Sequence, residues 1–442
     1  MKAARGLELW RGIYGVKATS PLLAVTCRND TSKRFQHPHN PAQGQSGDIG
    51  VVPDIPTSAK SSTLGNLKRG RGGRSSFSGV VATVFGASGF LGGAVSNQLG
   101  KIGSQLIIAH RCDPYDVRHI KVMGDLGQVL FQYCDIRDEA AVKRSMKYSN
   151  VVINLIGRDY ETKNFTFEQV HVEGARRIAR AAKEAGVERL IHFSALNASE
   201  NPTPILMKKG SEFLKSKARG EKAVLEEFPN ATIFRPADIF GTNDRFIMYY
   251  RYWLRRNVKW MPMYKWGEAT IKQPVFVGDV ARAVANAVTD PDSIGKIYEA
   301  VGPRRYVLAD LVDWFYQVMR RSPEMWGYRR TPLDPISRLK HKMFDIFAYR
   351  NPHLTTERAE REYVTDKRAG TLPDLEALGI KPLKTIEEYA PFVLYPFRAF
   401  NDYNDELGEF PTPPDPRYME DELHTELWKL YHQSPEQQLQ TR

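Results

Sequence analysis

An α/β fold built on a doubly wound parallel sheet is what the sequence predicts, and three observations lead to it. An apolar run leads directly into a glycine-rich turn near residue 86, further apolar runs alternate with helical stretches, and the intervals are those of repeated strand–helix units. The 442 residues suffice for two or three domains, or for one large domain with an appendage. We expect a smaller α/β region of the substrate-binding type and an irregular extension towards the C-terminus.

The first expected strand is Gly79–Phe85, whose apolar and β-branched residues suit a strand buried on both faces. It runs into Gly-Ala-Ser-Gly-Phe-Leu-Gly at residues 86–92, after which residues 93–100 are expected to be helical. Three glycines at this spacing permit a tight bend, a close approach of a pyrophosphate, and close packing of helix on strand. The turn predicts a Rossmann-like dinucleotide site at the helix N-terminus, with a ligand-free tight turn as the alternative. The contacts expected from it are Gly86, Ser88, Gly89, Phe90 and Leu91.

Five further strands follow, and the residues at their ends carry the rest of the nucleotide site. Arg111 ends the second strand, where an arginine suits a 2′-phosphate and favours NADPH over NADH; a solvated surface arginine is the alternative. Asp135 ends the third strand, where it would meet the adenine, and Leu155 and Ile156 end the fourth. A helix is expected over Phe167–Ala185, capped by the glycine that follows it. The five strands are expected at Gln105–His110, Val129–Cys134, Val151–Ile156, Leu190–Phe193 and Ala231–Phe234.

The N-terminal part of the chain differs in composition from the rest. The first 35 residues are basic, poor in acids and loosely amphipathic, which is typical of a mitochondrial transit peptide; a disordered tail is the alternative. Residues 36–78 are rich in Pro, Gly, Ser and Gln, and because this composition cannot bury enough apolar surface we expect a disordered linker. We then expect a nucleotide-binding domain over residues 79–320, including an insertion at 236–275, and a C-terminal extension at 321–442.

Charge and composition exclude some classes of protein. The net charge of +12 suits nucleic acid, anionic lipid or an acidic protein partner without choosing among them. Three scattered cysteines are too few for a disulfide framework or a zinc site, so we expect free thiols and no metal. No apolar stretch reaches the roughly 18 residues of a membrane-spanning helix, so we expect no transmembrane span.

Several segments in the same order resemble a known family. The resemblance is to short-chain dehydrogenase/reductases of the extended, atypical branch, and more narrowly to the nucleotide-binding accessory subunits of mitochondrial respiratory complex I. It covers residues 79–389 and implies a bound nucleotide, other complex I subunits as partners, and a peripheral position on the matrix side of the mitochondrial inner membrane. The segments that carry it are residues 85–92, Asn154–Phe165, Glu184–Ala198, Ser216–Val224, Arg235–Phe246, Lys272–Val284 and Gly295–Tyr306.

The resemblance also shows where this chain departs from working reductases. These use Ser, Tyr and Lys, with Tyr and Lys four residues apart on one helix face, so that the lysine lowers the phenol pKa and the tyrosine passes a proton to the substrate oxygen. Here Ser194 and Lys217 match, but Phe213 stands in place of the tyrosine and has no proton to give. His171 stands where many members have Asn, with an ordinary helix histidine as the alternative. Lys217 can still bind the nicotinamide ribose, so we expect a bound nucleotide and no catalytic residue.

Residues 245–266 hold six cations, eight aromatic residues and no acid. This mixture suits a membrane interface, an anionic lipid, a protein contact or single-stranded RNA. A substrate-domain helix whose aromatic residues lie in the core is the alternative. The resemblance favours a docking surface with anionic lipid contact.

Taken with the resemblance, the residues indicate a non-catalytic accessory subunit that holds NADPH as a structural ligand. The resemblance implies that it supports assembly and stability of complex I near the junction of the ubiquinone site and the membrane arm. Two other functions stay open. One is a free mitochondrial NADP-dependent reductase or isomerase, against which Phe213 counts; the other is an RNA-binding member of the same fold, which the basic charge favours but no RNA-reading motif supports.

Overall fold

The structure is a computed structural model, and it describes residues 68–252, 260–323, 329–332, 345, 355–401 and 410–419. These residues belong to one compact unit that spans Ser58–Arg442. The expected transit peptide at residues 1–35 lies outside the described residues. So do the first part of the expected linker, residues 36–67, and residues 253–259 of the basic aromatic segment.

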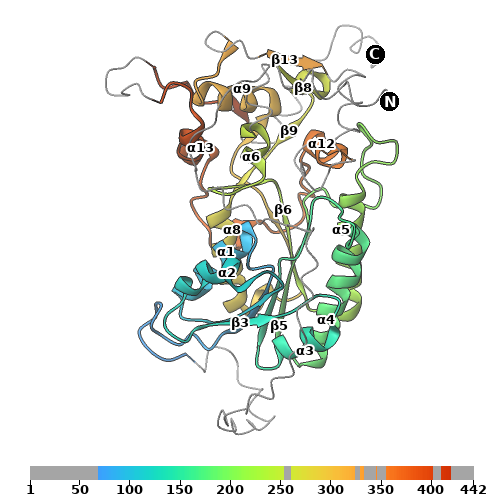
Figure 1. Ribbon diagram of the computed structural model, residues 1–442, viewed down its shortest axis with the longest axis vertical. Helices are drawn as coiled ribbons and strands as arrows, with labels where there is room; N and C mark the ends of the chain where they lie inside the picture. Colours follow the sequence, from blue (N-terminus) through green and yellow to red (C-terminus); the bar gives the residue numbers. More distant parts are fainter. Residues whose placement is uncertain are drawn as a thin grey trace, which may run out of the picture. The chain divides into compact units, whose positions relative to one another are not determined.

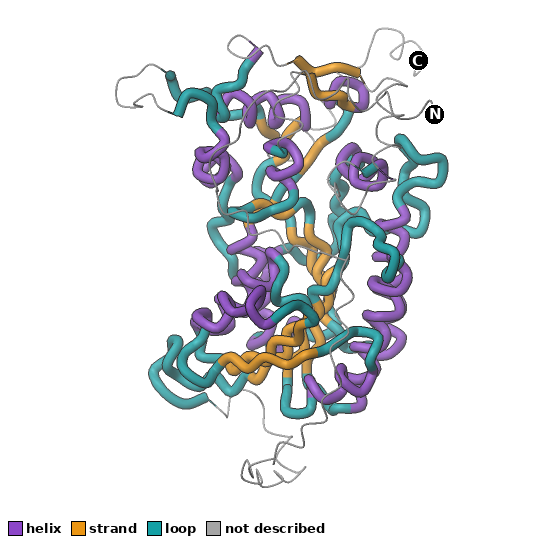
Figure 2. Tube along the Cα trace, in the orientation of Figure 1, coloured by secondary structure: helices purple, strands orange, loops and turns teal. Residues whose placement is uncertain are grey.

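At the centre of this unit lies a seven-stranded sheet in which all neighbouring strands are parallel. The strand order is β11-β6-β5-β4-β1-β2-β3, so the chain runs outward from β1 to β3, returns to the other side of β1 at β4, and runs outward again. This confirms the doubly wound parallel sheet (Figure 1, Figure 2). The strands are β1 (Val81–Phe85), β2 (Gln105–His110), β3 (Val129–Tyr133), β4 (Val151–Asn154), β5 (Arg189–Phe193), β6 (Thr232–Pro236) and β11 (Ile297–Ala300).

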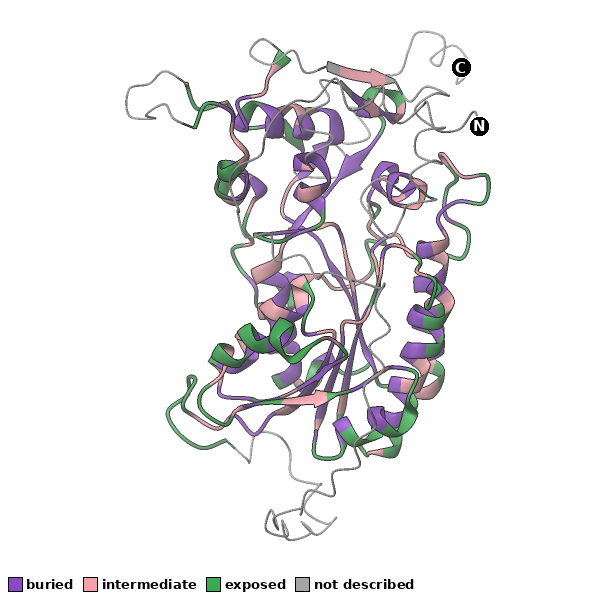
Figure 3. Cartoon of the chain, viewed as in Figure 1, coloured by how far each residue is buried: buried purple, intermediate pink, exposed green. Residues whose placement is uncertain are grey.

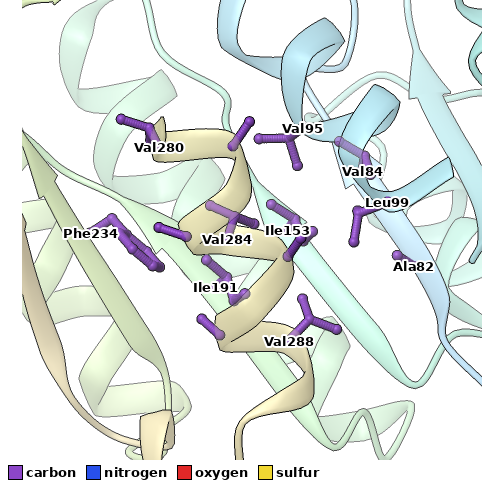
Figure 4. Packing of buried hydrophobic residues seen from close by; sticks show 14 of the residues in the cluster. Ala82, Val84, Val95, Leu99, Ile153, Ile191, Phe234, Val280, Val284 and Val288 are labelled. Carbon is purple, nitrogen blue, oxygen red and sulfur yellow. The ribbon is translucent and has the colours of Figure 1, made fainter. Parts of the chain in front are cut away.

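Helices cover both faces of the sheet. Helices α1 and α8 pack together on one face, and α3, α4 and α5 form the layer on the other (Figure 1). Val280, Val284 and Val288 recur every four residues along α8, which places them on one helix face, and there they pack with sheet residues such as Ile153 and Ile191 (Figure 4). The helices are α1 (Phe90–Lys101), α2 (Pro114–Val117), α3 (Glu139–Met146), α4 (Gly174–Glu184), α5 (Glu212–Glu227), α8 (Val277–Thr289), a π-helical turn at Glu168–Glu173, and 3₁₀ turns at Arg118–Met123 and Pro291–Ser293.

A second region is built from the C-terminal half of the chain and has its own apolar core (Figure 3). Residues on both sides of position 320 contribute to this core, and α9 contacts α13. The described part of the expected extension at 321–442 is therefore integrated into the fold. The helices and 3₁₀ turns are α6 (Phe246–Arg251), α9 (Leu308–Val318), α12 (Thr356–Tyr363), α13 (Ile386–Leu394), Tyr264–Gly267 and Tyr395–Phe397. One further 3₁₀ turn, Leu375–Leu378, packs against α8 in the core of the central sheet. The small sheets are β7 (Ile239–Phe240) with β10 (Val275–Phe276), β8 (Trp260–Met263) with β13 (Arg329–Pro332), and β9 (Ile271–Lys272), β12 (Arg305–Val307) and β14 (Tyr418–Met419).

The basic aromatic segment at 245–266 differs from the docking surface that we expect, as far as it is described. Phe246, Tyr249 and Tyr250 on α6 are at most 2% exposed and pack in the second core. The alternative of core aromatic residues therefore applies to α6, because a six-residue helix joins a fold by burying its apolar side chains. Of the described aromatic and basic side chains that follow, Lys265 and Trp266 are exposed.

The last residues of the expected linker are ordered. Arg69 and Phe77 form an antiparallel bridge, and the Ser75 hydroxyl donates to the Asp125 carboxylate over 2.9 Å. The Gln128 side-chain amide donates to the Arg74 carbonyl over 2.5 Å. Polar contacts hold residues 68–78 in place. Disorder is expected from the sequence because this segment has few apolar residues to bury, and that reasoning does not take polar contacts into account.

Candidate functional site

A cleft of about 280 Å³ opens at the carboxyl ends of the central strands. Gly86, Leu155, Ser194 and Ala237, which follow β1, β4, β5 and β6, contribute to its wall. Strands β1 and β4 are neighbours although β2 and β3 lie between them in the sequence. The cleft therefore lies at the switch point of the sheet, where open α/β sheets bind their ligands.

The glycines of the turn at residues 86–92 differ in what they do. Gly86 has a φ of 82°, and a Cβ there would lie 3.0 Å from the Leu155 backbone. A Cβ at Gly92 would lie 2.3 Å from the Gly86 carbonyl oxygen, so α1 could not pack against the turn. Gly89 has an extended backbone (φ −78°, ψ 169°), which any residue adopts, and its Cβ would lie 3.2 Å from the same oxygen. Gly86 and Gly92 are thus required by the fold, whereas the missing side chain of Gly89 keeps the cleft open.

The first turn of α1 provides a place for an anion. Among the residues that the structure describes, no side chain caps this helix, and its first turn holds no acidic residue. The first N–H groups of a helix have no intrahelical partners and carry partial positive charge, so pyrophosphate oxygens fit there. Gly89, Phe90 and Leu91 line the cleft, whereas Ser88 does not and instead accepts a weak 3.8 Å contact from the Cys112 thiol.

Two arginines lie where we expect the adenosine ribose. The guanidinium carbons of Arg111 and Arg137 lie 4.5 and 4.6 Å from the centre of the Phe165 ring. The Arg137 guanidinium also binds Asp135 over 3.0 Å, and this hydrogen bond holds the pKa of the Asp135 carboxyl below its usual value. Arg111 and Asp135 lie outside the wall of the cleft itself. Sequence reasoning missed Arg137 and Phe165, because no local pattern shows that the loop after β4 returns to the end of β3.

The positions of the reductase triad come together at the cleft. The Lys217 ammonium donates to the Phe193 carbonyl over 3.0 Å, and burial lowers the pKa of Lys217 to about 8. Phe213 and Ser194 line the cleft, and the Lys217 nitrogen lies 6.0 Å from the centre of the Phe213 ring. The buried Ser194 hydroxyl makes no hydrogen bond within the described part of the chain. An unsatisfied buried hydroxyl is costly, so a bound group such as the nicotinamide ribose fits this site.

His171 is held as a neutral imidazole. The Arg158 backbone N–H donates to Nε2 over 3.2 Å, so Nδ1 carries the proton and donates to the Ser216 hydroxyl over 2.8 Å. The Ser216 hydroxyl donates in turn to the Phe213 carbonyl. Burial lowers the pKa of His171 to about 2. The alternative of an ordinary structural histidine therefore fits the geometry, because its hydrogen bonds connect the π-helical turn to α5.

We expect His171 to make the folded protein sensitive to acid. In the unfolded chain the imidazole gains a proton near pH 6.5, whereas in the folded chain burial keeps it neutral down to about pH 2. The unfolded state binds more protons between these values, so stability falls as the pH falls below about 6.5. His171→Asn should reduce this loss by up to about 1.4 kcal/mol per pH unit below pH 6. Urea unfolding at pH 7, 6 and 5 measures the difference, and equal pH slopes for both proteins would contradict the assignment.

The cleft brings together some of the expected site residues and leaves others out. Expected residues that are absent from its wall are Ser88, Arg111, Asp135, Ile156 and Lys217; Ile156 packs into the apolar cluster beneath α4, and Lys217 lies just behind Phe193. The described residues contain no group of three or more His, Cys, Asp or Glu side chains that could hold a metal ion. Within the same ranges, no helix is both long enough and apolar enough to cross a membrane. Expected residues that line the cleft are Gly86, Gly89, Phe90, Leu91, Leu155, Ser194 and Phe213.

The fold and the position of this cleft define a protein of the Rossmann class, and comparisons with known proteins identify the family. Residues 82–306 match the sequence profile of the NAD dependent epimerase/dehydratase family. The triphenylmethane reductase of Citrobacter sp., solved with NADP(H), superposes with a TM-score of 0.52 at 18% identity, over 71% of this chain and 99% of that one. This likeness supports the fold.

Two curated relatives match most of the chain. The mitochondrial NADH dehydrogenase (ubiquinone) 1 alpha subcomplex subunit 9 of Rattus norvegicus is 45% identical over 350 residues, 78% of this chain and 87% of that one. The mitochondrial NADH-ubiquinone oxidoreductase 40 kDa subunit of Neurospora crassa is 37% identical over 340 residues, 76% of this chain and 84% of that one. The chain therefore belongs to the NAD dependent epimerase/dehydratase family and, within it, to the family of the mitochondrial NADH dehydrogenase alpha subcomplex subunit 9.

Proposed function

We propose that the chain is a non-catalytic accessory subunit of mitochondrial respiratory complex I that holds NADPH as a structural ligand and supports assembly and stability of the complex. Its partners are other complex I subunits, and its place is peripheral, on the matrix side of the inner membrane near the junction of the ubiquinone site and the membrane arm. The observation that carries the proposal is Phe213 in a site that otherwise keeps the glycine turn, Ser194 and Lys217. For anionic lipid, the described candidates are the exposed Lys265 and Trp266.

The residues present fit three parts of NADPH. The N–H groups at the start of α1 suit the pyrophosphate, the pair Arg111 and Arg137 suits the 2′-phosphate, and Lys217 with Ser194 suits the nicotinamide ribose. Bound NADPH supplies a hydride donor, but a carbonyl that accepts hydride also needs a proton at its oxygen. Phe213 has no proton at the position where the family donates one, so the site holds the nucleotide without the proton step.

Arg111→Asp should select against NADPH. The change removes one of two cations that lie on Phe165 and places a second carboxylate near Asp135, where the 2′-phosphate is expected. A lost charged hydrogen bond corresponds to a loss of NADPH affinity of about tenfold or more. Binding of NADPH and NADH to the purified chain measures the change, and Arg176→Asp, in an exposed ion pair with Glu226, is the charge-matched control. The identification of NADP(H) would be wrong if the nucleotide extracted from the chain were NAD(H), or if Arg111→Asp kept NADPH affinity.

We expect no NADPH oxidation above background when the wild-type protein is offered a panel of carbonyl compounds. Phe213→Tyr restores the missing phenol beside Lys217, yet it should not create a fast reductase, because turnover also needs a carbonyl held close to C4 of the nicotinamide. The absorbance of NADPH at saturating carbonyl measures both proteins. Robust turnover by the wild type would overturn the non-catalytic proposal.

Separation of intact mitochondrial complexes on native gels tests the partner. An accessory subunit co-migrates with complex I, a free reductase migrates alone, and an RNA-binding protein migrates in a particle that ribonuclease dissolves. Nucleotide extracted from the complex should be NADPH. Free migration of the chain, or loss of its large particle on ribonuclease treatment, would refute the proposed role.

A further inference from the structure

The end of the cleft away from the glycine turn, called here the inner end, is strongly charged. Six ionisable residues line it, four cations and two carboxylates. They come from segments far apart in the sequence, including α12 of the expected extension, so no local motif indicates them. The six are Asp238, Arg245, Lys272, Arg358, Arg361 and Asp366.

Two of the four cations have close carboxylate partners of their own. The Lys272 ammonium lies 3.0 Å from Asp238 and 3.8 Å from Asp366, so one lysine serves both carboxylates of the cleft wall. Arg358 is bound by Glu362 over 2.8 Å, one turn further along α12. The other two cations, Arg245 and Arg361, have their nearest carboxylate outside the wall of the cleft.

This carboxylate is Asp159, and it lies at different distances from the two arginines. Arg245 binds it over 2.5 Å, whereas the Arg361 guanidinium lies 3.9 Å away, beyond the length of a hydrogen bond. Within the described chain the Arg361 guanidinium has this long contact as its nearest carboxylate and makes no hydrogen bond. Its planar set of N–H donors is therefore available.

The surroundings of Arg361 compensate its positive charge only in part. The side chain is 17% exposed, and its guanidinium carbon lies 4.4 Å from the centre of the Phe213 ring, whose π face compensates the charge in part. Burial and the neighbouring Arg358 lower the pKa of Arg361, which means that its charge is poorly stabilised here. A buried guanidinium without an acceptor is costly, and a carboxylate or phosphate matches its geometry with two parallel hydrogen bonds.

We infer that the inner end of the cleft is a second binding site, for the carboxylate or phosphate group of a small ligand, with the Arg361 guanidinium as its principal contact. The site goes beyond NADPH binding, because the pyrophosphate belongs at the glycine turn and the 2′-phosphate at Arg111. A cleft of about 280 Å³ that also receives the nicotinamide end of a dinucleotide admits only a small ligand.

Titration calorimetry of the full-length chain tests the site with three probes: acetate, inorganic phosphate, and acetamide as the neutral analogue of acetate. Sodium chloride keeps the ionic strength constant. We expect saturable binding of acetate or phosphate with one site per chain, and none of acetamide. Arg361→Gln should weaken the binding about tenfold or more, since it removes a charged, two-point contact. Tighter binding of phosphate or of acetate identifies the group that the natural ligand carries.

Two control variants locate the anion. Arg176→Gln removes a cation from an exposed ion pair and should leave binding unchanged. Arg111→Gln should also leave acetate binding unchanged, whereas loss of binding in this variant would place the anion in the nucleotide site and overturn the inference. Equal binding of acetate and acetamide, no saturable binding, or full binding by Arg361→Gln would overturn it as well.

The anion site can still be tested if Arg361→Gln does not fold, or if the chain does not bind NADPH. If Arg361→Gln does not fold, the acetate–acetamide contrast in the wild type and the weaker binding expected of Arg361→Lys decide the matter. None of these results requires NADPH, so failure of the proposed cofactor would leave them intact.

Discussion

Replacing Gly89 by valine is expected to expel the nucleotide and to lower the melting temperature of the protein by several degrees. A Cβ at this position would lie 3.2 Å from the Gly86 carbonyl oxygen, and its branches would occupy the part of the turn that lines the cleft. A ligand that binds only the folded state, present at a hundred times its Kd, stabilises that state by about 2.7 kcal/mol. The variant loses this contribution. Thermal melts with and without NADPH measure it, and mitochondria carrying the variant should contain less assembled complex I.

Gly93→Val is the matched control for this experiment. It places the same side chain four residues further on in α1, where a Cβ would contact only the Met123 methyl group, at 3.7 Å. We expect it to keep both the nucleotide and the effect of NADPH on melting. NADH oxidation by an artificial acceptor should stay normal per assembled complex in either variant. A Gly89→Val protein that lacked nucleotide yet assembled to normal levels would refute the structural role of NADPH.

Six of the seven sheet strands could be predicted because their sequences are mainly apolar, as is usual for strands of a parallel sheet that helices cover. Strand β11 escaped prediction because Glu299 lies in its middle. This glutamate is only 2% exposed, and its carboxylate accepts a hydrogen bond from the Ala369 backbone N–H over 2.8 Å. Its partner is 70 residues away in the sequence. From the sequence alone, a glutamate at this position indicates a surface residue, because its hydrogen-bond partner is known only once the fold is known.

The start of helix α1 also differs from the prediction, again because tertiary contacts are not visible in the local sequence. It begins at Phe90, three residues before the expected start at residue 93. Glycine lowers helix propensity, so the two glycines at 92 and 93 argue against a helix there. Gly92 is nevertheless helical, because only a residue without a side chain fits 2.3 Å from the Gly86 carbonyl oxygen. Close packing against the turn outweighs the local preference.

Some residues of the candidate site could be predicted from the sequence and others could not. Its glycine turn and the positions Ser194, Phe213 and Lys217 were predictable, because each lies in a short segment at fixed spacing. Arg137 and Arg361 were not, since Arg137 lies on a neighbouring loop, where it contacts Phe165, and Arg361 reaches the cleft from α12. Both arginines contact aromatic rings of the site, Phe165 and Phe213, so tertiary packing rather than a motif assigns them.

The buried ion pair on α12 should give the second large effect. Arg358 and Glu362 lie 2.8 Å apart with side chains 2% and 0% exposed, and Glu362 also accepts a hydrogen bond from the Tyr250 hydroxyl. Arg358→Met would leave the Glu362 carboxylate buried without its guanidinium partner. Losing one member of a buried pair costs about 3–5 kcal/mol, so we expect a drop of that size in the free energy of unfolding, measured in urea. Arg176→Met, which breaks an exposed pair with Glu226, should cause little measurable change.

The double variant Arg358→Met/Glu362→Leu separates the unpaired charge from the loss of packing. With both charges gone, no buried ion lacks a partner, and apolar replacements of similar volume for such pairs are often neutral or stabilising. The Tyr250 hydroxyl loses its acceptor, at a cost of about 1–3 kcal/mol. The double variant should therefore be more stable than Arg358→Met alone. If Arg358→Met instead cost less than about 1 kcal/mol, Arg358 and Glu362 would not form a buried pair that joins α12 to Tyr250 of α6. In that case α12 would not line the inner end of the cleft, and the inference of an anion site at Arg361 would be wrong.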